Sequence, residues 1–191
     1  MRLGVLVSGR GSNLEAILDA GLPVVIVISN RPDVRALTVA EQHGVPTRVL
    51  RRADFADALA RDDAIGAALR GAGVELTVLA GYDQLLRPAY FAAYGGRTLN
   101  IHPSLLPAHG GAGMMGMAVH ASVLAAGDAE TGVTIHEVTP ELDAGPILAQ
   151  ATVPVLRGDD ADALAARVLV EEHRLLVTTL QRLSAGDPTP A

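Results

Sequence analysis

An amide and an imidazole stand two residues apart where an apolar segment of the chain meets a proline. They are Asn100 and His102, and Pro103 follows. Side chains two positions apart in a strand point to the same face, and proline ends a strand because it donates no ladder hydrogen bond. An amide that can hold an oxyanion beside a proton carrier suits acyl-transfer chemistry. The alternative interpretation is a polar strand end followed by a turn.

A third candidate is Asp143, which lies in a glycine-flanked loop with no helix or strand to cap. A carboxylate near an imidazole fixes its tautomer and favours proton transfer near neutral pH. An aspartate in such a loop is also common as a simple turn residue. If the chemical interpretation holds, Asn100, His102 and Asp143 converge on one cleft at the carboxyl edge of the sheet.

The segment Gly9-Arg10-Gly11-Ser12-Asn13 follows the first apolar run and opens a helix. Ser12 and Glu15 fit a capping box, and backbone N–H groups at a helix start can bind an anion. A dinucleotide site would need glycine where Leu14 stands and an acidic residue near Arg31. A site for a phosphate alone needs neither, and a tight turn needs no ligand.

The histidines do not indicate a metal site. Four histidines could be considered together as zinc ligands: His102, His109, His120 and His136. Their spacings match no zinc signature. His136 lies in an alternating segment, which favours a packed or hydrogen-bonded ring. We expect no metal, and the absence of a Gly-x-Ser-x-Gly elbow argues against a serine hydrolase.

Apolar runs alternate with helical patterns over roughly the first hundred residues, which predicts a doubly wound, mostly parallel α/β sheet. The predicted strands are 2–7, 24–28 and 75–80, and the predicted helices are 13–20, 34–43 and 55–69. Gly21, Gly44 and Gly71 stand where those helices should end.

The pattern changes after Pro107. We predict a mobile Gly/Met-rich loop, a short helix, a β-hairpin and a final helix. Their ranges are 109–116, 120–126, 133–138 with 147–155, and 159 to about 183, followed by a frayed tail over 184–191. We therefore expect a single domain, with a Rossmann-like half over 1–107 and a second half over 108–191.

Composition excludes several classes of protein. The 191 residues are 49% hydrophobic, include no cysteine, and draw all 15 basic residues from arginine. Thiol nucleophiles, iron–sulfur clusters, Walker-A ATPases and Schiff-base enzymes are thereby excluded. A net charge of −6 with 3% aromatic residues argues against nucleic-acid binding. No apolar run is long enough for a membrane span, and the start resembles a strand rather than a signal peptide, so we expect a cytoplasmic protein.

Five segments, in order, resemble the glycinamide ribonucleotide formyltransferases of the folate-dependent formyltransferase superfamily. They are Ser8-Gly9-Arg10-Gly11-Ser12-Asn13-Leu14, Leu79-Ala80-Gly81-Tyr82, Asn100-Ile101-His102-Pro103-Ser104-Leu105-Leu106-Pro107, Gly132-Val133-Thr134-Ile135-His136 and Glu141-Leu142-Asp143-Ala144-Gly145-Pro146. The resemblance spans about residues 2–183. The Asn100 segment and the Asp143 loop together are specific to folate-dependent formyl transfer.

The resemblance implies an enzyme of purine biosynthesis that transfers the formyl group of 10-formyltetrahydrofolate to the amine of glycinamide ribonucleotide. It implies catalytic roles for Asn100, His102 and Asp143, without a covalent intermediate or a metal. Ribotide-binding residues implied are Gly11, Ser12, Asn13, Leu169, Val170, Glu171 and Glu172, with Glu172 the foremost side-chain contact. Folate-binding residues implied are Asp83, Gln84, Leu85, Leu86, Asn100, Thr139, Pro140, Glu141, Leu142 and Asp143. The resemblance also implies that the half over 1–107 binds the ribotide and that the half over 108–191 completes the folate site. The partners are these two small molecules, and a homodimer is left open.

The chain departs from the family at several positions. Ala58 stands where the family often has a basic residue facing the glutamate tail of the folate, with Arg61 nearby, and Leu169 replaces a common polar residue. Ala112 and Met115 replace a lysine and an aromatic residue that one branch carries in its glycine-rich loop, so this loop is expected to close differently.

Three alternatives remain from the sequence. A methionyl-tRNA formyltransferase should have a further C-terminal domain and a basic surface, and a formyltetrahydrofolate hydrolase should have a further N-terminal domain. We expect neither, because the matching segments nearly fill this acidic chain. A non-catalytic nucleotide-binding protein would use the Gly11 loop but would not need Asn100, His102 and Asp143 together.

Overall fold

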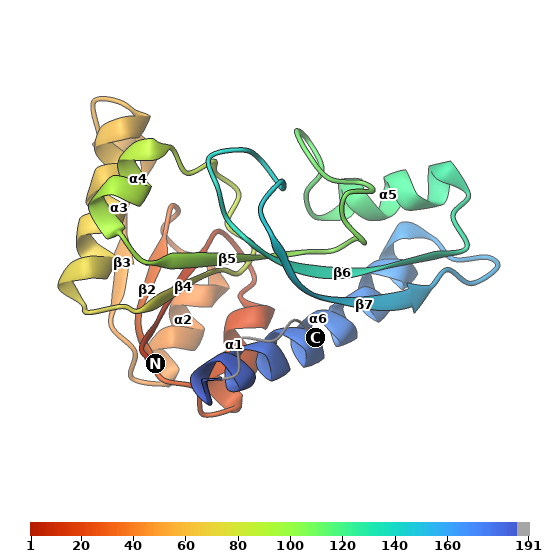
Figure 1. Ribbon diagram of the computed structural model, residues 1–191, viewed down its shortest axis with the longest axis horizontal. Coiled ribbons are helices and arrows are strands. Elements are labelled where there is room, and N and C mark those ends of the chain that lie inside the picture. Colours follow the sequence, from red (N-terminus) through yellow and green to blue (C-terminus); the bar gives the residue numbers. More distant parts are fainter. Residues whose placement is uncertain (187–191) are drawn as a thin grey trace. The chain divides into compact units, whose positions relative to one another are not determined.

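The computed structural model describes residues 1–186 and consists of two compact units (Figure 1). The first is Met1–Leu99 and the second starts at Asn100, so the boundary falls within one strand. The single domain divided at residue 107 stays a prediction.

The first unit alternates strands with helices. Its elements are β1 (Leu3–Val7), α1 (Ser12–Asp19), β2 (Val24–Ser29), α2 (Arg35–Gln42), β3 (Thr47–Val49), the 3₁₀ turn η1 (Arg52–Asp54), α3 (Ala58–Gly71), β4 (Leu76–Leu79) and α4 (Pro88–Tyr94). The three long predicted strands and helices are confirmed to within a few residues. The short β3 and α4 were not predicted, because three and seven residues are too few to show a period.

The four strands of the first unit are parallel and lie in the order β3-β2-β1-β4. The chain builds outward from β1 to β3 and then returns to the other side of β1 for β4. The direction of winding therefore reverses between β1 and β4. In such sheets the segments that follow the two strands at a reversal diverge and form the usual ligand site.

Two local expectations were wrong. The capping box does not form: Gly11, in a left-handed conformation, precedes α1, and no side chain caps the helix. Glu15 instead pairs with Arg35, whose Nη2 lies 2.8 Å from both carboxylate oxygens. The third helix starts at Ala58 rather than at residue 55, because the Asp57 carboxylate accepts a hydrogen bond from the Ala60 N–H.

Glycine sets how closely α3 and α4 pack. A Cβ at Gly66 would lie 2.7 Å from the Ala93 Cβ and 2.8 Å from the Tyr90 carbonyl oxygen. Only glycine lets the two backbones approach this closely. Gly71 is the last residue of α3, close to the end expected from the sequence, and Gly73 adopts a left-handed conformation just after the helix.

The second unit contains the hairpin and final helix expected from the sequence. It starts within β5 (Arg97–His102) and continues with α5 (Met117–Ala126), β6 (Glu130–Glu137), β7 (Ile147–Pro154) and α6 (Ala161–Ser184). Strands β6 and β7 are antiparallel. The α/β fold with a doubly wound, mostly parallel sheet is therefore confirmed.

Helix α6 holds the second unit together. The Asp160 carboxylate caps it by accepting from the Ala163 N–H at 2.8 Å, and the helix contacts α5, β6 and β7. Its buried face consists of Leu164, Val168, Leu175, Leu176, Thr179 and Leu180. Most of the expected tail lies outside the described residues, and Ser184 ends the helix. Within residues 1–186, no helix is both long and apolar enough to cross a membrane.

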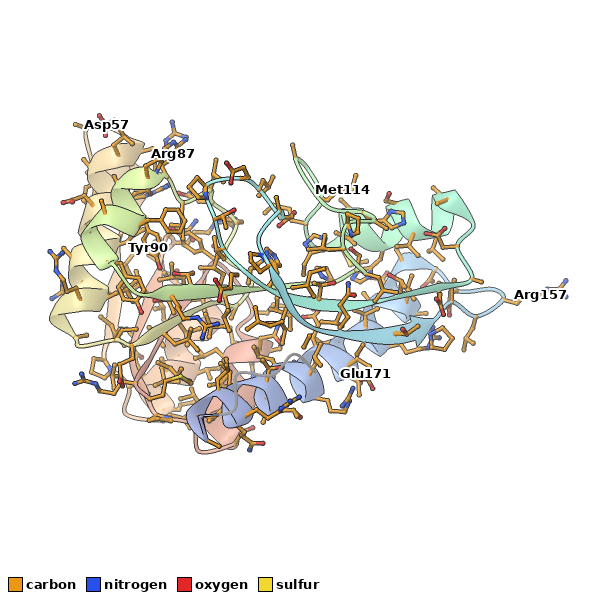
Figure 2. The ribbon with its side chains drawn as sticks, viewed as in Figure 1. Asp57, Arg87, Tyr90, Met114, Arg157 and Glu171 are labelled. Atoms are coloured by element: carbon orange, nitrogen blue, oxygen red, sulfur yellow. The ribbon has the colours of Figure 1, made fainter. Side chains whose placement is uncertain are left out.

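A buried ion pair on α3 holds the segment before α4. The Arg61 and Asp62 side chains are 2% and 0% exposed, and Arg61 Nε donates to Asp62 Oδ1 at 2.8 Å. Arg61 Nη2 also donates to the Leu85 carbonyl at 3.2 Å, and Asp62 Oδ2 accepts from the Arg87 N–H at 2.8 Å. Figure 2 shows Arg87 at the start of α4. The Arg61 and Asp62 side chains thus fix the backbone of residues 85–87 through hydrogen bonds.

We expect Arg61→Leu to lower the free energy of unfolding by about 3 kcal/mol. The buried Asp62 carboxylate would keep only the more exposed guanidinium of Arg87, 3.9 Å away, as its counter-charge. Urea unfolding followed by circular dichroism measures this loss. Asp54→Asn is the matched control, because it removes a partner from the Arg51–Asp54 ion pair on the surface, where such pairs contribute little. If Arg61→Leu unfolded at the same urea concentration as the wild type, the buried ion pair would not have the stabilising role assigned to it.

Candidate active site

Asn100 and His102 lie on β5, two residues apart as the sequence indicated. Asn100 is half-buried, and the His102 side chain is 5% exposed. Strand β6 is the hydrogen-bonded neighbour of β5, and its residue His136 is 3% exposed. Two imidazoles and one amide therefore come from neighbouring strands of the second unit.

The ring of His136 determines how the Asn100 amide is oriented. His136 Nδ1 lies 3.0 Å from the Glu137 carbonyl oxygen, which can only accept, so Nδ1 carries the proton. Burial lowers the pKa of His136, outweighing the opposing effects of Glu137 and Asp143. The ring is therefore neutral near pH 7, and its Nε2 accepts from Asn100 Nδ2 at 3.1 Å. The amide keeps a second N–H group.

The Asp143 carboxylate lies beside both imidazoles. Its Oδ2 is 3.9 Å from His102 Nδ1, and its Oδ1 is 3.7 Å from His136 Nε2. Both distances exceed a hydrogen bond. Oδ2 also accepts from the Gly111 N–H at 2.9 Å. A carboxylate that is 10% exposed and beside two rings creates a strong local field in a dry site.

The Asp143 loop is held by a close backbone approach. Asp143 has a left-handed φ of 52°. A Cβ at Gly145 would lie 1.8 Å from the Glu137 carbonyl oxygen, so the chain passes there only because residue 145 is glycine. This approach brings the loop back to the end of β6, next to His136.

A hydroxyl on β6 anchors the chain that follows His102. Thr134 Oγ1 donates to the Ser104 carbonyl at 2.7 Å and accepts from the Leu106 N–H at 3.0 Å. It also accepts from Gln150 Nε2 at 2.9 Å, and the same amide donates to the Leu106 carbonyl at 3.0 Å. One hydroxyl thus uses its donor and both acceptor positions, and it fixes the turn after β5.

His102 uses its other nitrogen within the second unit. Its Nε2 lies 2.9 Å from the His109 carbonyl oxygen. Because a carbonyl accepts and never donates, Nε2 carries the proton, and Nδ1 faces Asp143. The arrangement can therefore exchange a proton at Nδ1, next to a carboxylate that balances a positive ring and an amide that can donate to an oxyanion.

In the first unit, the glycine loop has the geometry of an anion site. Gly11 has φ 77°, and its carbonyl accepts the first intrahelical bond of α1, from the Glu15 N–H. The N–H groups of the first helical turn precede that bond and point out of the helix end. A Cβ at Gly11 would lie 2.7 Å from both Cα and Cβ of Ala36, so a side chain would displace α2.

Asp83 follows β4 and is held where the winding reverses. Its Oδ1 accepts from Ser8 Oγ at 3.0 Å and from Asn30 Nδ2 at 2.7 Å. Arg31 pairs with Oδ2. The carboxylate thus connects the ends of β1, β2 and β4 at the carboxyl edge of the first unit's strands.

The remaining predicted site segments differ in exposure. Among residues 83–86, Leu86 is 2% exposed and Leu85 is 46% exposed. In the second unit, Leu142 is 49% exposed in the loop that carries Asp143. On α6, Leu169, Glu171 and Glu172 are half-buried and Val170 is exposed; Figure 2 shows Glu171 on the surface of that helix.

Sequence reasoning missed two residues of this site. His136 was correctly predicted to be packed or hydrogen-bonded, but its contacts with Asn100 and Asp143 were not foreseen, although it ends one of the five resembling segments. His109 was considered only as a metal candidate. Over residues 1–186, the structure brings no three histidine or acidic side chains into a group that could hold a metal ion.

Comparison with known families agrees with this geometry. The family described as formyl transferase matches residues 1–180. The chain belongs to this family of enzymes.

Named relatives narrow the comparison. The phosphoribosylglycinamide formyltransferase of Escherichia coli is 41% identical over 97% of this chain and 88% of its own. The crystal structure of phosphoribosylglycinamide formyltransferase from Brucella melitensis is 46% identical, with a TM-score of 0.87, over 97% of this chain and 96% of that one. The trifunctional purine biosynthetic protein adenosine-3 of Bos taurus is 39% identical, but the chain spans only 18% of its length.

The lowered pKa of His136 predicts how stability depends on pH. The unfolded chain takes up a proton at this residue near the ordinary value of about 6.5, whereas the folded chain does so only at lower pH. The stabilisation of the folded state that comes from the neutral His136 ring is therefore fully present above a pH of about 6.5. It is lost as the pH falls from there through the lower pKa of the folded state. Wild type should lose urea resistance between about pH 7 and pH 5 more steeply than His136→Gln. Identical slopes for the two proteins would contradict this assignment.

Proposed function

We propose that the chain transfers the formyl group of 10-formyltetrahydrofolate to the amine of glycinamide ribonucleotide in purine biosynthesis. The observation that carries the proposal is the cluster of Asn100, His102, His136 and Asp143 in the second unit. Support also comes from a relative of similar length that is named for this reaction. Formation of product from the two substrates, followed by chromatography, tests it directly. A protein that bound the ribotide without turnover would favour a non-catalytic function.

In the proposed reaction, the substrate amine attacks the formyl carbon and forms a new C–N bond. The carbonyl oxygen becomes an oxyanion, which the second N–H of Asn100 and the protonated His102 ring stabilise. The bond to the folate nitrogen then breaks. A proton leaves the attacking nitrogen and another reaches the leaving nitrogen, with His102 as the carrier. Asp143 orients the ring and balances its charge.

The two substrates are assigned to different segments. The phosphate of the ribotide is proposed to bind the N–H groups of Gly11, Ser12 and Asn13. Further ribotide contacts are proposed for Leu169, Val170, Glu171 and Glu172. Folate contacts are proposed for Asp83, Gln84, Leu85, Leu86, Asn100, Thr139, Pro140, Glu141, Leu142 and Asp143. Cytoplasmic location stays a prediction from the sequence.

Asp143→Asn should lower turnover at least about a hundredfold, because it keeps the shape of the side chain and removes the charge beside His102. Ribotide affinity should change little, because the proposed phosphate contacts are backbone groups of the glycine loop. Steady-state kinetics and calorimetric titration with the ribotide separate the two effects. The matched control is Asp33→Asn, because Asp33 is another left-handed aspartate, with φ 54°. Equal turnover in both variants would remove Asp143 from the mechanism.

Gly11→Ala should abolish most ribotide binding, because its Cβ would collide with Ala36 and its φ is left-handed. Gly21→Ala is the control: Gly21 also has a positive φ of 69°, but a Cβ there would meet nothing within 4 Å. Ser12→Ala should weaken the free energy of ribotide binding by about 1 kcal/mol, the magnitude of one hydrogen bond. Calorimetric titration measures all three, and equal effects of Gly11→Ala and Gly21→Ala would place the phosphate elsewhere.

A further inference from the structure

The loop between β5 and α5 is rich in glycine, yet it supplies a hydrogen bond to His102. The glycines are Gly110, Gly111, Gly113 and Gly116. A segment of this composition has high conformational entropy and does not by itself hold one carbonyl in place. The carbonyl that accepts from His102 Nε2 belongs to His109, which immediately precedes the glycines. Some other contact is needed to hold residue 109.

The ring of His109 supplies that contact, because both of its nitrogens are bound. Nε2 lies 2.7 Å from Asp128 Oδ2, and Nδ1 lies 2.8 Å from Ser122 Oγ. Ser122 is on α5, and Asp128 follows that helix. The His109 side chain is 14% exposed. The ring therefore attaches the start of the loop to α5 and to the turn that leads into β6.

The backbone of His109 shows that the anchor overcomes a local preference. Its φ is 53°, in the left-handed region that residues other than glycine rarely adopt. Such a conformation persists when surrounding contacts determine it. The neighbouring carbonyl of Ala108 is also held, since it accepts from Ser104 Oγ at 2.6 Å. Ring, backbone and neighbour thus together fix the direction of the His109 carbonyl.

We propose that His109 is a positioning residue: its ring, held by Ser122 and Asp128, fixes the carbonyl that keeps a proton on His102 Nε2 and makes Nδ1 the nitrogen that exchanges protons. This inference rests on the proposed formyl transfer for its effect on rate. Nδ1 then faces Asp143 across 3.9 Å, too far for a direct hydrogen bond. A substrate atom or a water molecule can lie between them.

Two sets of variants test the proposal. His109→Gly removes the ring and still permits the left-handed backbone. The double variant Ser122→Ala/Asp128→Ala keeps His109 and removes both of its partners, neither of which is assigned a contact with substrate. The control is Asp19→Ala, which breaks a similar carboxylate–histidine pair, Asp19 with His43 at 3.4 Å, in the first unit.

The first measurement is ¹⁵N NMR of the neutral His102 ring, assigned with a His102→Gln spectrum. Wild type and the Asp19→Ala control should show the Nε2–H tautomer alone, whereas both sets of test variants should show a mixture of tautomers. A role of His109 in folding alone would leave the tautomer unchanged. A mixture in wild type, or a single tautomer in all variants, would overturn the proposal.

The second measurement is formyl transfer at saturating substrates. Turnover should fall about tenfold in His109→Gly and in the double variant, which is part of the roughly hundred- to ten-thousandfold that a positioned proton carrier provides. The KM for the ribotide should stay at the wild-type value. If wild type shows no formyl transfer while the tautomers change as expected, the proposed function fails and the positioning role stands. If transfer occurs and neither tautomer nor turnover changes, the positioning role fails alone.

Discussion

The carboxylate of Asp143 is the group around which the second unit's site is arranged. A buried charge is tolerated only where hydrogen bonds and nearby dipoles replace water. Here the Gly111 N–H supplies a hydrogen bond, and two imidazoles lie just beyond that distance. The close approach of Gly145 to the Glu137 carbonyl determines where the loop can run and thus where the charge lies. The residues assigned to chemistry are those that this charge can influence.

The two histidines near Asp143 differ because their hydrogen-bond partners differ. His136 has a carbonyl at Nδ1 and an amide N–H at Nε2, so it serves as a neutral acceptor that orients Asn100. His102 has a carbonyl at Nε2 and a carboxylate facing Nδ1, so Nδ1 is its nitrogen that faces the charge. Similar rings on neighbouring strands thus acquire different roles from backbone carbonyls, which only accept. Neither role can be recognised from residue type alone.

The first unit achieves its order in a different way. Asp83 connects the ends of three strands through Ser8, Asn30 and Arg31, while the ion pair of Arg61 and Asp62 holds the segment that follows Asp83. Both networks support the backbone after β4, where the winding of the sheet reverses. Loops at such a reversal are open to ligands, so their shape has to come from anchored polar contacts rather than from a packed core.

The sequence by itself determined most of the elements and singled out Asn100, His102 and Asp143 as candidates for chemistry. Its apolar runs and glycines located β1, β2, β4 and the hairpin, because strand and helix periods are local properties. The two-residue spacing of Asn100 and His102 placed them on one face, since alternation in a strand is also local.

Only the tertiary structure decided the remaining contacts. Glu15 pairs with Arg35 rather than capping its helix, and the short α4 packs closely against α3 at Gly66. Asp143 reaches His102 and His136, and His109 directs its carbonyl to His102, because chain segments distant in sequence must satisfy each other's buried polar groups.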